Sequence, residues 1–269
     1  MQERLDVLQK HLKKIDDVIS KGVYKDNWES LAFHKVPDWY RNSKLGIFIH
    51  WGVYSVPAHG NEWYPRWMYK KGNAINEWHT KTYGPLKEFG YKDFVPMFKA
   101  EKYNAEKWAE LFKEAGAGFV MPVAEHHDGF QMYDSELSEW CATKKGPCKD
   151  VLGMLKEEVE KKGMVFATSS HRVEHYWFMG GMRQTESDLP ENLSYGDFYW
   201  PSYEEPFSDG KTNQTQGFEV ETLFMEDWLA RCCEIVDKYR PKIVFFDWWI
   251  QVEPMKPYLK KFAAYYYNR

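Results

Sequence analysis

The sequence has few cysteines, and none of them stands in a metal-binding or redox spacing. The four are Cys141, Cys148, Cys232 and Cys233. No pair is spaced CxxC, and an ordinary disulfide cannot join the neighbours Cys232 and Cys233. We therefore expect free thiols, a reducing and hence cytoplasmic location, no metal and no cofactor.

The sequence also lacks long apolar runs and a bias toward charge of one sign. No run approaches the roughly 20 apolar residues that cross a bilayer, and the first 22 residues contain no signal-peptide core. The net charge is -4, with both signs interspersed. These features argue against a membrane or nucleic-acid partner.

Aromatic residues, in contrast, are abundant. The 269 residues are 43% hydrophobic and 28% charged, which is enough apolar content for a sizeable core. Aromatic residues make up 18% of the chain, with 13 Trp. Trp and Tyr beyond the needs of a core suggest a surface on which a ligand stacks.

The first segment predicts an amphipathic helix. Five apolar residues recur at steps of three and four between charges, and Gly22 follows them. We expect this helix to pack on the outside of the main domain or to form a dimer contact. The predicted division is a helical extension at 1–34 and a catalytic domain at 35–269.

The remaining chain alternates between predicted strands and helices. Apolar runs at 45–49, 119–123, 164–168 and 243–246 predict strands, and helical patterns lie at 103–115, 154–160, 221–239 and 257–267. This alternation indicates an α/β fold of the (β/α)8 TIM-barrel type. Only four or five βα units are present, so we expect the N-terminal half of a barrel. Either the chain is truncated, or a second chain or a homo-oligomer supplies the remainder, or the sheet is completed in some other way.

Each predicted strand ends in polar side chains, as catalytic groups do at the carboxyl ends of barrel strands. The run at 243–246 predicts a strand buried on both faces, and Asp247 follows it. Trp248 and Trp249 then suggest the walls of a sugar pocket. The alternative for Asp247 is a cap of the next turn. The other strand-end groups are His50, His126, His127 and His171, with Glu62 and Trp63 in the first long loop.

Two kinds of site remain open for these groups. A metal-dependent barrel hydrolase would use His126, His127 and Asp128, although neighbouring strand residues point to opposite sides unless a turn intervenes. Neutral imidazoles in an aromatic pocket suit sugar hydroxyls better.

Glycoside hydrolysis requires two carboxyl groups, and Asp247 on a rigid strand suits the nucleophile. Glu253 and Glu174 are candidates for the acid/base, but a solvated surface position is the simpler interpretation of each.

Structural roles are the alternative for each residue taken singly. His50 is then a core histidine, His127 caps a turn, Trp63 packs a loop, and His171 with Arg172 pairs with Glu174. Their joint occurrence at strand ends favours a functional site. A polar insertion at about 179–218 is expected to be an ordered loop, anchored by Tyr195, Phe198, Tyr199, Trp200 and Tyr203.

Three motifs resemble those of glycoside hydrolase family 29, the α-L-fucosidases. They are KLGIFIHWGVYSVPAHGNEWY at 44–64, AEHHDGFQMYDSELSEW at 124–140 with GPCKDVLG at 146–153, and FFDWW around Asp247. The resemblance runs from about residue 35 onward. It implies a retaining exo-glycosidase that releases terminal α-L-fucose from fucosylated oligosaccharides or glycoconjugates.

The resemblance assigns roles to individual residues. It implies that Asp247 is the nucleophile and that six residues bind the sugar: His50, Glu62, Trp63, His126, His127 and, on a weaker match, His171. The sequence departs from the family pattern at Phe245 and Trp248 beside the nucleophile and in SSHRVEHYW after the third strand. The family's acid/base would align beyond Arg269, and its C-terminal β-sandwich has no counterpart. A non-catalytic or weakly active fucose-binding fragment is therefore the alternative.

Overall fold

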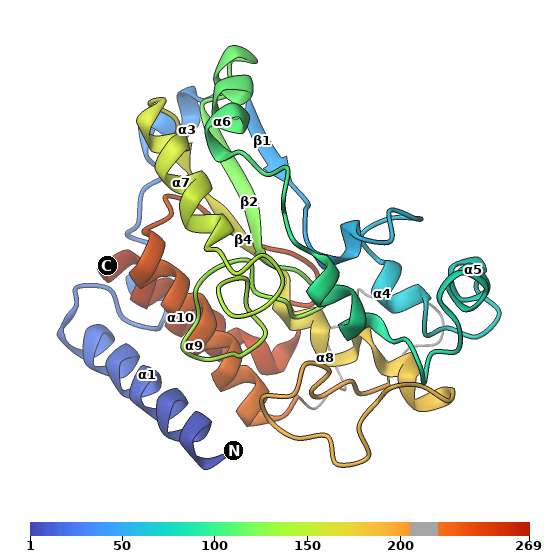
Figure 1. Ribbon diagram of the computed structural model, residues 1–269. Helices are drawn as coiled ribbons and strands as arrows, with labels where there is room; N and C mark the ends of the chain where they lie inside the picture. Colours follow the sequence, from blue (N-terminus) through green and yellow to red (C-terminus); the bar gives the residue numbers. More distant parts are fainter. Residues whose placement is uncertain (205–219) are drawn as a thin grey trace.

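A parallel β-sheet forms the centre of the molecule (Figure 1). The computed structural model describes residues 1–204 and 220–269. The strands are β1 (Gly46–Ile49), β2 (Phe119–Glu125), β3 (Val165–Phe166), β4 (Thr168–Ser170) and β5 (Val244–Phe246). They are ordered β1-β2-β4-β5, and β3 also pairs with β2. The third predicted strand is thus present but divided at Ala167.

A helix follows each of the four strand positions. These helices are α6 (Ala105–Glu114), α7 (Val151–Lys161), α9 (Thr222–Tyr239) and α10 (Lys256–Asn268). The side chains of Asn104 and Asp150 accept hydrogen bonds from backbone N–H groups in the first turns of α6 and α7, which fixes where these helices begin. The described residues therefore form consecutive parallel βα units, confirming the predicted fold class.

Shorter helices lie in the connections. They are α2 (Trp28–Leu31), α3 (Asp38–Asn42), η1 (Val53–Ser55), α4 (Tyr64–Trp67), α5 (Ala74–Tyr83), η2 (Tyr91–Met97), η3 (Arg172–Glu174), α8 (His175–Phe178), η4 (Gly180–Gln184) and η5 (Glu253–Met255). Of these, α4 begins directly after Trp63 and α8 carries Phe178, two aromatic residues of the site described below.

The two faces of the sheet differ in burial. Ile47 and Ile49 of β1 pack toward the core on the helix side, while Phe48 points the other way and is 43% exposed. In β5, Phe246 packs against the core, but Phe245 is 41% exposed. The prediction that this strand is buried on both faces is therefore wrong. Side chains alternate along a strand, and in β5 only one of the two sets meets the helices.

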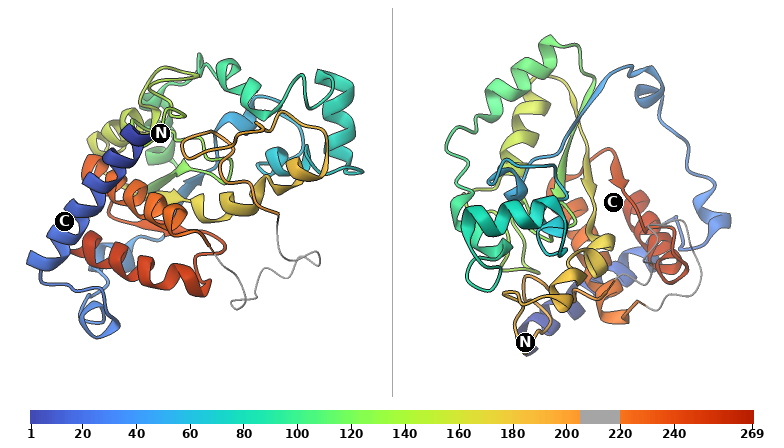
Figure 2. Two further views of the ribbon diagram at one scale, coloured as in Figure 1. Left: turned by 90° about the horizontal axis from the view of Figure 1, so that it is seen from below. Right: turned by 90° about the vertical axis from the view of Figure 1, so that its right-hand side faces the viewer.

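The N-terminal helix α1 (Gln2–Lys21) packs on the outer side of α9 and α10, as Figures 1 and 2 show. Leu8, Ile15 and Ile19 are buried in this contact, and the helix ends at Gly22. Beyond it, Tyr24 and Asn268 exchange hydrogen bonds of 3.0 and 2.7 Å. The expected amphipathic helix and its outer position are confirmed.

The expected aromatic anchors hold the described part of the insertion. Four of them are buried: Tyr195, Phe198, Tyr199 and Trp200. The fifth, Tyr203, is 37% exposed and has its ring beside Tyr176. The part of the insertion at 205–218 lies outside the described residues, so the expected loop order is confirmed only up to residue 204.

All four cysteines are free thiols; Cys148 is exposed and the others are buried.

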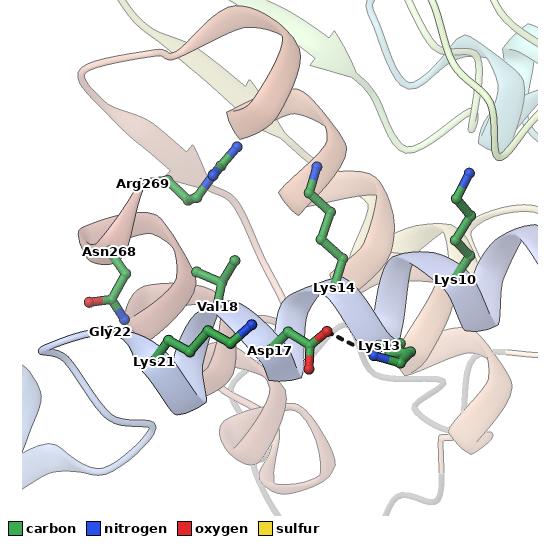
Figure 3. Close-up of a pocket in the computed structure, with 9 residues that line it drawn as sticks. All are labelled: Lys10, Lys13, Lys14, Asp17, Val18, Lys21, Gly22, Asn268 and Arg269. Atoms are coloured by element: carbon green, nitrogen blue, oxygen red, sulfur yellow. Dashed lines mark hydrogen bonds and ion pairs between the residues drawn. The ribbon is translucent and has the colours of Figure 1, made fainter.

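A surface pocket lies between α1 and the end of α10 (Figure 3). It is lined by Lys10, Lys13, Lys14, Asp17, Val18, Lys21, Gly22, Asn268 and Arg269. In the part of the chain that the structure describes, no helix is long and apolar enough to cross a membrane.

The burial of α1 predicts that it contributes to stability. Leu8→Ala removes a side chain with 0% exposure, so we expect the free energy of unfolding to fall by about 2–5 kcal/mol. The neighbouring exposed Gln9 provides the control, and Gln9→Ala should change it by about 0.5 kcal/mol or less. Urea unfolding measures both, and equal values would contradict the packing role of α1.

Candidate active site

The polar groups that follow the strands meet at one edge of the sheet. Because the strands are parallel, their carboxyl ends lie at the same edge. His50 follows β1, His126 and His127 follow β2, His171 follows β4 and Asp247 follows β5. The site is therefore built from residues nearly 200 positions apart in the chain.

A tight turn after β2 brings both neighbouring histidines into this site. The register between β2 and β4 shifts after Val123, and the Gly129 N–H donates to the carbonyl oxygen of His126. Gly129 has φ +81, and a Cβ there would lie 2.8 Å from the ring of His175. Only glycine fits without strain. The turn thus removes the alternation that would send His126 and His127 to opposite sides.

The imidazoles form one cluster. The ring centroid of His171 lies 5.2 Å from that of His50, 5.0 Å from that of His126 and 5.3 Å from that of His127. The rings of His126 and His127 are 4.4 Å apart. His50 is exposed, whereas the other three are buried. One side of the cluster therefore faces solvent.

Asp247 lies against this cluster with its side chain 24% exposed. Its Oδ2 atom is 3.0 Å from His171 Nδ1 and 3.5 Å from His127 Nε2. Burial alone would raise the pKa of Asp247, but the two imidazoles outweigh it and hold the pKa well below its ordinary value. The carboxylate is thus ionised, partly open to solvent and fixed in direction.

His127 lies between two carboxylates. Its Nε2 atom is 3.4 Å from Glu174 Oε2 and 3.5 Å from Asp247 Oδ2, while its Nδ1–H donates to the carbonyl of His171 at 2.9 Å. Burial lowers the pKa of His127, but Glu174 and Asp247 reverse this and raise it. This geometry favours an imidazolium whose charge is shared by both acids.

The other three imidazoles favour the neutral form. Burial lowers the pKa of His50, takes that of His126 well below its ordinary value and brings that of His171 to about 4. The Nδ1–H of neutral His171 donates to Asp247, and its Nε2 accepts from the Ser169 hydroxyl at 2.9 Å. Neutral imidazoles of this kind can donate to and accept from sugar hydroxyls.

Two aromatic side chains, Trp63 just before α4 and Phe178 of α8, lie against the cluster. The ring of Trp63 lies 5.8 Å from His127 and 5.5 Å from Phe178, and the Arg66 guanidinium lies 5.4 Å from it. Glu62 is half-buried and lies near enough to His50 for its negative charge to raise the pKa of that imidazole, against the larger lowering by burial. All seven residues predicted for the site are therefore brought together.

The tryptophans after the strand differ from the expectation. Trp249 is 1% exposed and packs against Trp177 at 4.5 Å, so it belongs to the core and cannot wall a sugar pocket. Trp248 is 48% exposed. The backbone at Trp249 has φ +72, and this turn sends the two indoles to different environments.

The two candidate glutamates also separate. Glu253 is exposed and pairs with Lys256, as the surface interpretation predicts. Glu174 is 1% exposed, so the surface interpretation is wrong for this residue. Its other carboxylate oxygen lies 3.7 Å from Arg66 Nη1. His171 pairs with Asp247 instead of Glu174, which excludes the predicted His171–Glu174 salt bridge.

The structure changes the set of residues that could hold a metal. Asp128 accepts hydrogen bonds from Tyr91 Oη at 2.6 Å and Phe130 N at 3.0 Å, so it caps the turn. It does not join His126 and His127 as a third ligand. Among residues 1–204 and 220–269, two other groups bring ligand atoms within 4.8 Å: His50–His126–His171 and His127–His171–Asp247.

A buried network of ion pairs, called the ion network below, lies at the end of β2 next to the site. Glu125 Oε1 lies 3.1 Å from Arg172 Nη1 and 3.0 Å from Arg231 Nη1, and Asp227 Oδ2 lies 3.0 and 2.8 Å from the same two arginines. Charges of both signs balance in this network. The i,i+4 spacing of Asp227 and Arg231 on a helix could have signalled a pair, but not its burial.

The chain matches a family model described as Alpha-L-fucosidase over residues 11–269. It is 33% identical to an alpha-L-fucosidase of Branchiostoma floridae and 30% identical to the human plasma alpha-L-fucosidase. Each match covers 83% of this chain, but only 44% and 42% of the relatives. The chain thus spans less than half the length of these curated relatives.

Solved structures give the same result. The Thermotoga maritima alpha-fucosidase bound to a mechanism-based inhibitor is similar with a TM-score of 0.69 and 33% identity. The structure of that enzyme with fucose gives 0.68 and 34%. Each comparison covers 91% of this chain and 54% of the other.

The ion network predicts a large asymmetry between buried and exposed pairs. Arg231→Met leaves Glu125 and Asp227 with a single arginine in a buried place, so we expect a loss of about 3–5 kcal/mol of unfolding free energy. The matched control is Lys13→Met, which breaks an exposed pair with Asp17 and should leave the free energy of unfolding nearly unchanged. Urea unfolding of both variants measures this, and a loss under about 1 kcal/mol for Arg231→Met would contradict the role of the network.

Proposed function

The chain belongs to the alpha-L-fucosidase family, and from that premise we propose that it hydrolyses terminal α-L-fucosyl linkages through a covalent glycosyl–Asp247 intermediate. The observation that carries the proposal is the contact of Asp247 with His127 and His171. A nucleophilic carboxylate must be ionised, accessible and held in one direction. Asp247 meets these three conditions.

The proposed catalytic step displaces the leaving group with the Asp247 carboxylate. One Asp247 oxygen attacks the anomeric carbon while the glycosidic oxygen departs and takes up a proton, and water later cleaves the glycosyl ester. The structure of the Thermotoga maritima relative contains a mechanism-based inhibitor, so that enzyme is a suitable comparison for covalent chemistry at Asp247.

The proposed sugar pocket consists of the imidazole cluster, Glu62 and Trp63. A buried sugar hydroxyl needs a donor or acceptor, and a site built for one arrangement of hydroxyls rejects sugars that lack it. Trp63 offers an apolar ring to the less polar side of the sugar. The relative solved with fucose supports fucose as the sugar.

The general acid that would give a proton to the leaving group is the part of the proposed mechanism with the least structural support. Glu174 is buried behind His127, so we infer that it acts on the imidazole instead of reaching a leaving group. Glu253 is exposed and engaged by Lys256. Neither of the two glutamates considered from the sequence is placed as a general acid.

A fucose-binding chain with weak or no turnover is the second candidate. The same observation favours it, because nucleophile and sugar ligands come together while an acid/base is not evident among the glutamates discussed. The two candidates differ in whether a covalent adduct forms at Asp247.

Trapping discriminates between the two candidates. Incubation with an activated 2-fluoro-fucosyl reagent should label one peptide, the one that contains Asp247, because the fluorine slows hydrolysis of the intermediate. Asp247→Ala should give no adduct, while Glu253→Ala, which changes an exposed carboxylate six residues away, should be labelled like the unaltered chain. Mass spectrometry measures this, and no adduct on the unaltered chain favours the binding candidate.

The dependence of kcat/KM on the leaving group tests whether this chain supplies a general acid. We expect kcat/KM for a natural fucoside to be lower than for an activated aryl fucoside by about 10²–10⁴-fold, the usual contribution of general acid catalysis. Initial rates with the two substrates measure the ratio. Equal and high activity on both would place an acid/base among the residues of this chain.

A further inference from the structure

Three imidazoles of the site meet the requirements of a transition-metal centre. His50, His126 and His171 each offer a ring nitrogen, and these atoms lie within 4.8 Å of one another. The three residues follow β1, β2 and β4, so a rigid sheet fixes their spacing. We propose that this trio binds a divalent transition-metal ion such as Zn²⁺ and that, if the sugar occupies the site as proposed above, ion and sugar compete.

A buried, unpartnered nitrogen is the second observation. His126 is 3% exposed, and its Nδ1 atom has no hydrogen-bond partner within the described part of the chain. Buried polar atoms in native proteins are nearly always bonded to protein or to water, so this nitrogen is available to a ligand that reaches the cluster. A metal ion would give this ring a partner.

His171 is oriented as metal-ligating histidines usually are. Its Nδ1–H faces the Asp247 carboxylate at 3.0 Å, which fixes the tautomer and leaves the Nε2 lone pair as the donor. The Ser169 hydroxyl at 2.9 Å now donates to that lone pair and would rotate away when a metal binds. Asp247 would thereby become the outer partner of a ligand.

The chemistry of the trio selects the kind of ion. Imidazole nitrogens suit Zn²⁺, Cu²⁺, Ni²⁺ and Co²⁺, whereas Mg²⁺ and Ca²⁺ prefer oxygen ligands. Because His50 is exposed, the ion has a path from solvent and keeps a position open to water.

The other possible group fits less well. In His127–His171–Asp247, the carboxylate is already bonded to His171 Nδ1. His127 Nδ1–H donates to the His171 carbonyl, and its Nε2 faces Glu174 as well as Asp247. A metal there would have to replace the existing contacts of Asp247 with both imidazoles and of His127 with Glu174, so the trio with the unpartnered His126 nitrogen is the better site.

Metal titration of the chelator-treated chain tests the proposal. Calorimetry with Zn²⁺ should show one equivalent bound per chain, and Co²⁺ should give the visible absorption bands of a nitrogen-ligated ion. His50→Ala should weaken Zn²⁺ binding at least about tenfold. This variant changes an exposed ring, and circular dichroism checks its fold.

His59→Ala is the matched control, because His59 is a partly exposed histidine stacked on Trp78 outside the cluster. Its Zn²⁺ affinity should equal that of the unaltered chain, and Mg²⁺ should not bind to the site. Equal weakening in both variants, or no weakening in His50→Ala, would overturn the proposed metal site.

Competition separates this inference from the proposed function. L-fucose should raise the apparent Kd for Zn²⁺ in the unaltered chain. Zn²⁺ binding that depends on His50 but is indifferent to L-fucose would uphold the metal site and contradict the location of the sugar. If the unaltered chain does not bind Zn²⁺ but Asp247 is still labelled by the 2-fluoro-fucosyl reagent, the metal inference alone is contradicted.

Discussion

The rest of the site depends on the electrostatic contact between one carboxylate and two imidazoles. Asp247 is partly removed from water, a place where an isolated charge is costly. His171 donates a hydrogen bond to this carboxylate. His127, whose pKa is raised by Glu174 and Asp247, supplies a compensating positive charge when it is protonated. The carboxylate is consequently both ionised and immobile, and the surrounding residues are arranged to maintain this contact.

Maintaining the contact requires buried charge at several levels. His127 can carry a proton because Glu174 faces it opposite Asp247, and Arg66 in turn lies near Glu174. Beneath them, Glu125 at the end of β2 is neutralised by two arginines. Asp247 is thus held by His127 and His171, and His127 is in turn paired with Glu174, a buried residue outside the proposed sugar pocket.

The sequence predicted the fold class, and it predicted that the groups at the strand ends lie close together, because both follow from local patterns. Apolar runs that end in His50, His127 or Asp247 identify strand ends, and parallel strands must bring these ends together. The burial of Phe245 was mispredicted, since periodicity does not tell which set of alternating side chains meets a helix. Trp249 was mispredicted because its backbone has positive φ.

The role of Glu174 and the ion network were beyond local pattern. They depend on side chains from η3 and α9 meeting at the end of β2, contacts between residues 47 and 106 positions apart.

The depth of the Glu125–Asp227 network has a consequence for the conditions that the protein tolerates. Dissolved ions screen charges that face water, with a Debye length of about 8 Å at physiological ionic strength, but penetrate little into an interior. Exposed ion pairs such as Lys13 with Asp17 on α1 will weaken at high salt concentration. The network of Arg172 and Arg231 is buried, so the ion pairs next to the imidazole cluster should persist in strongly saline media.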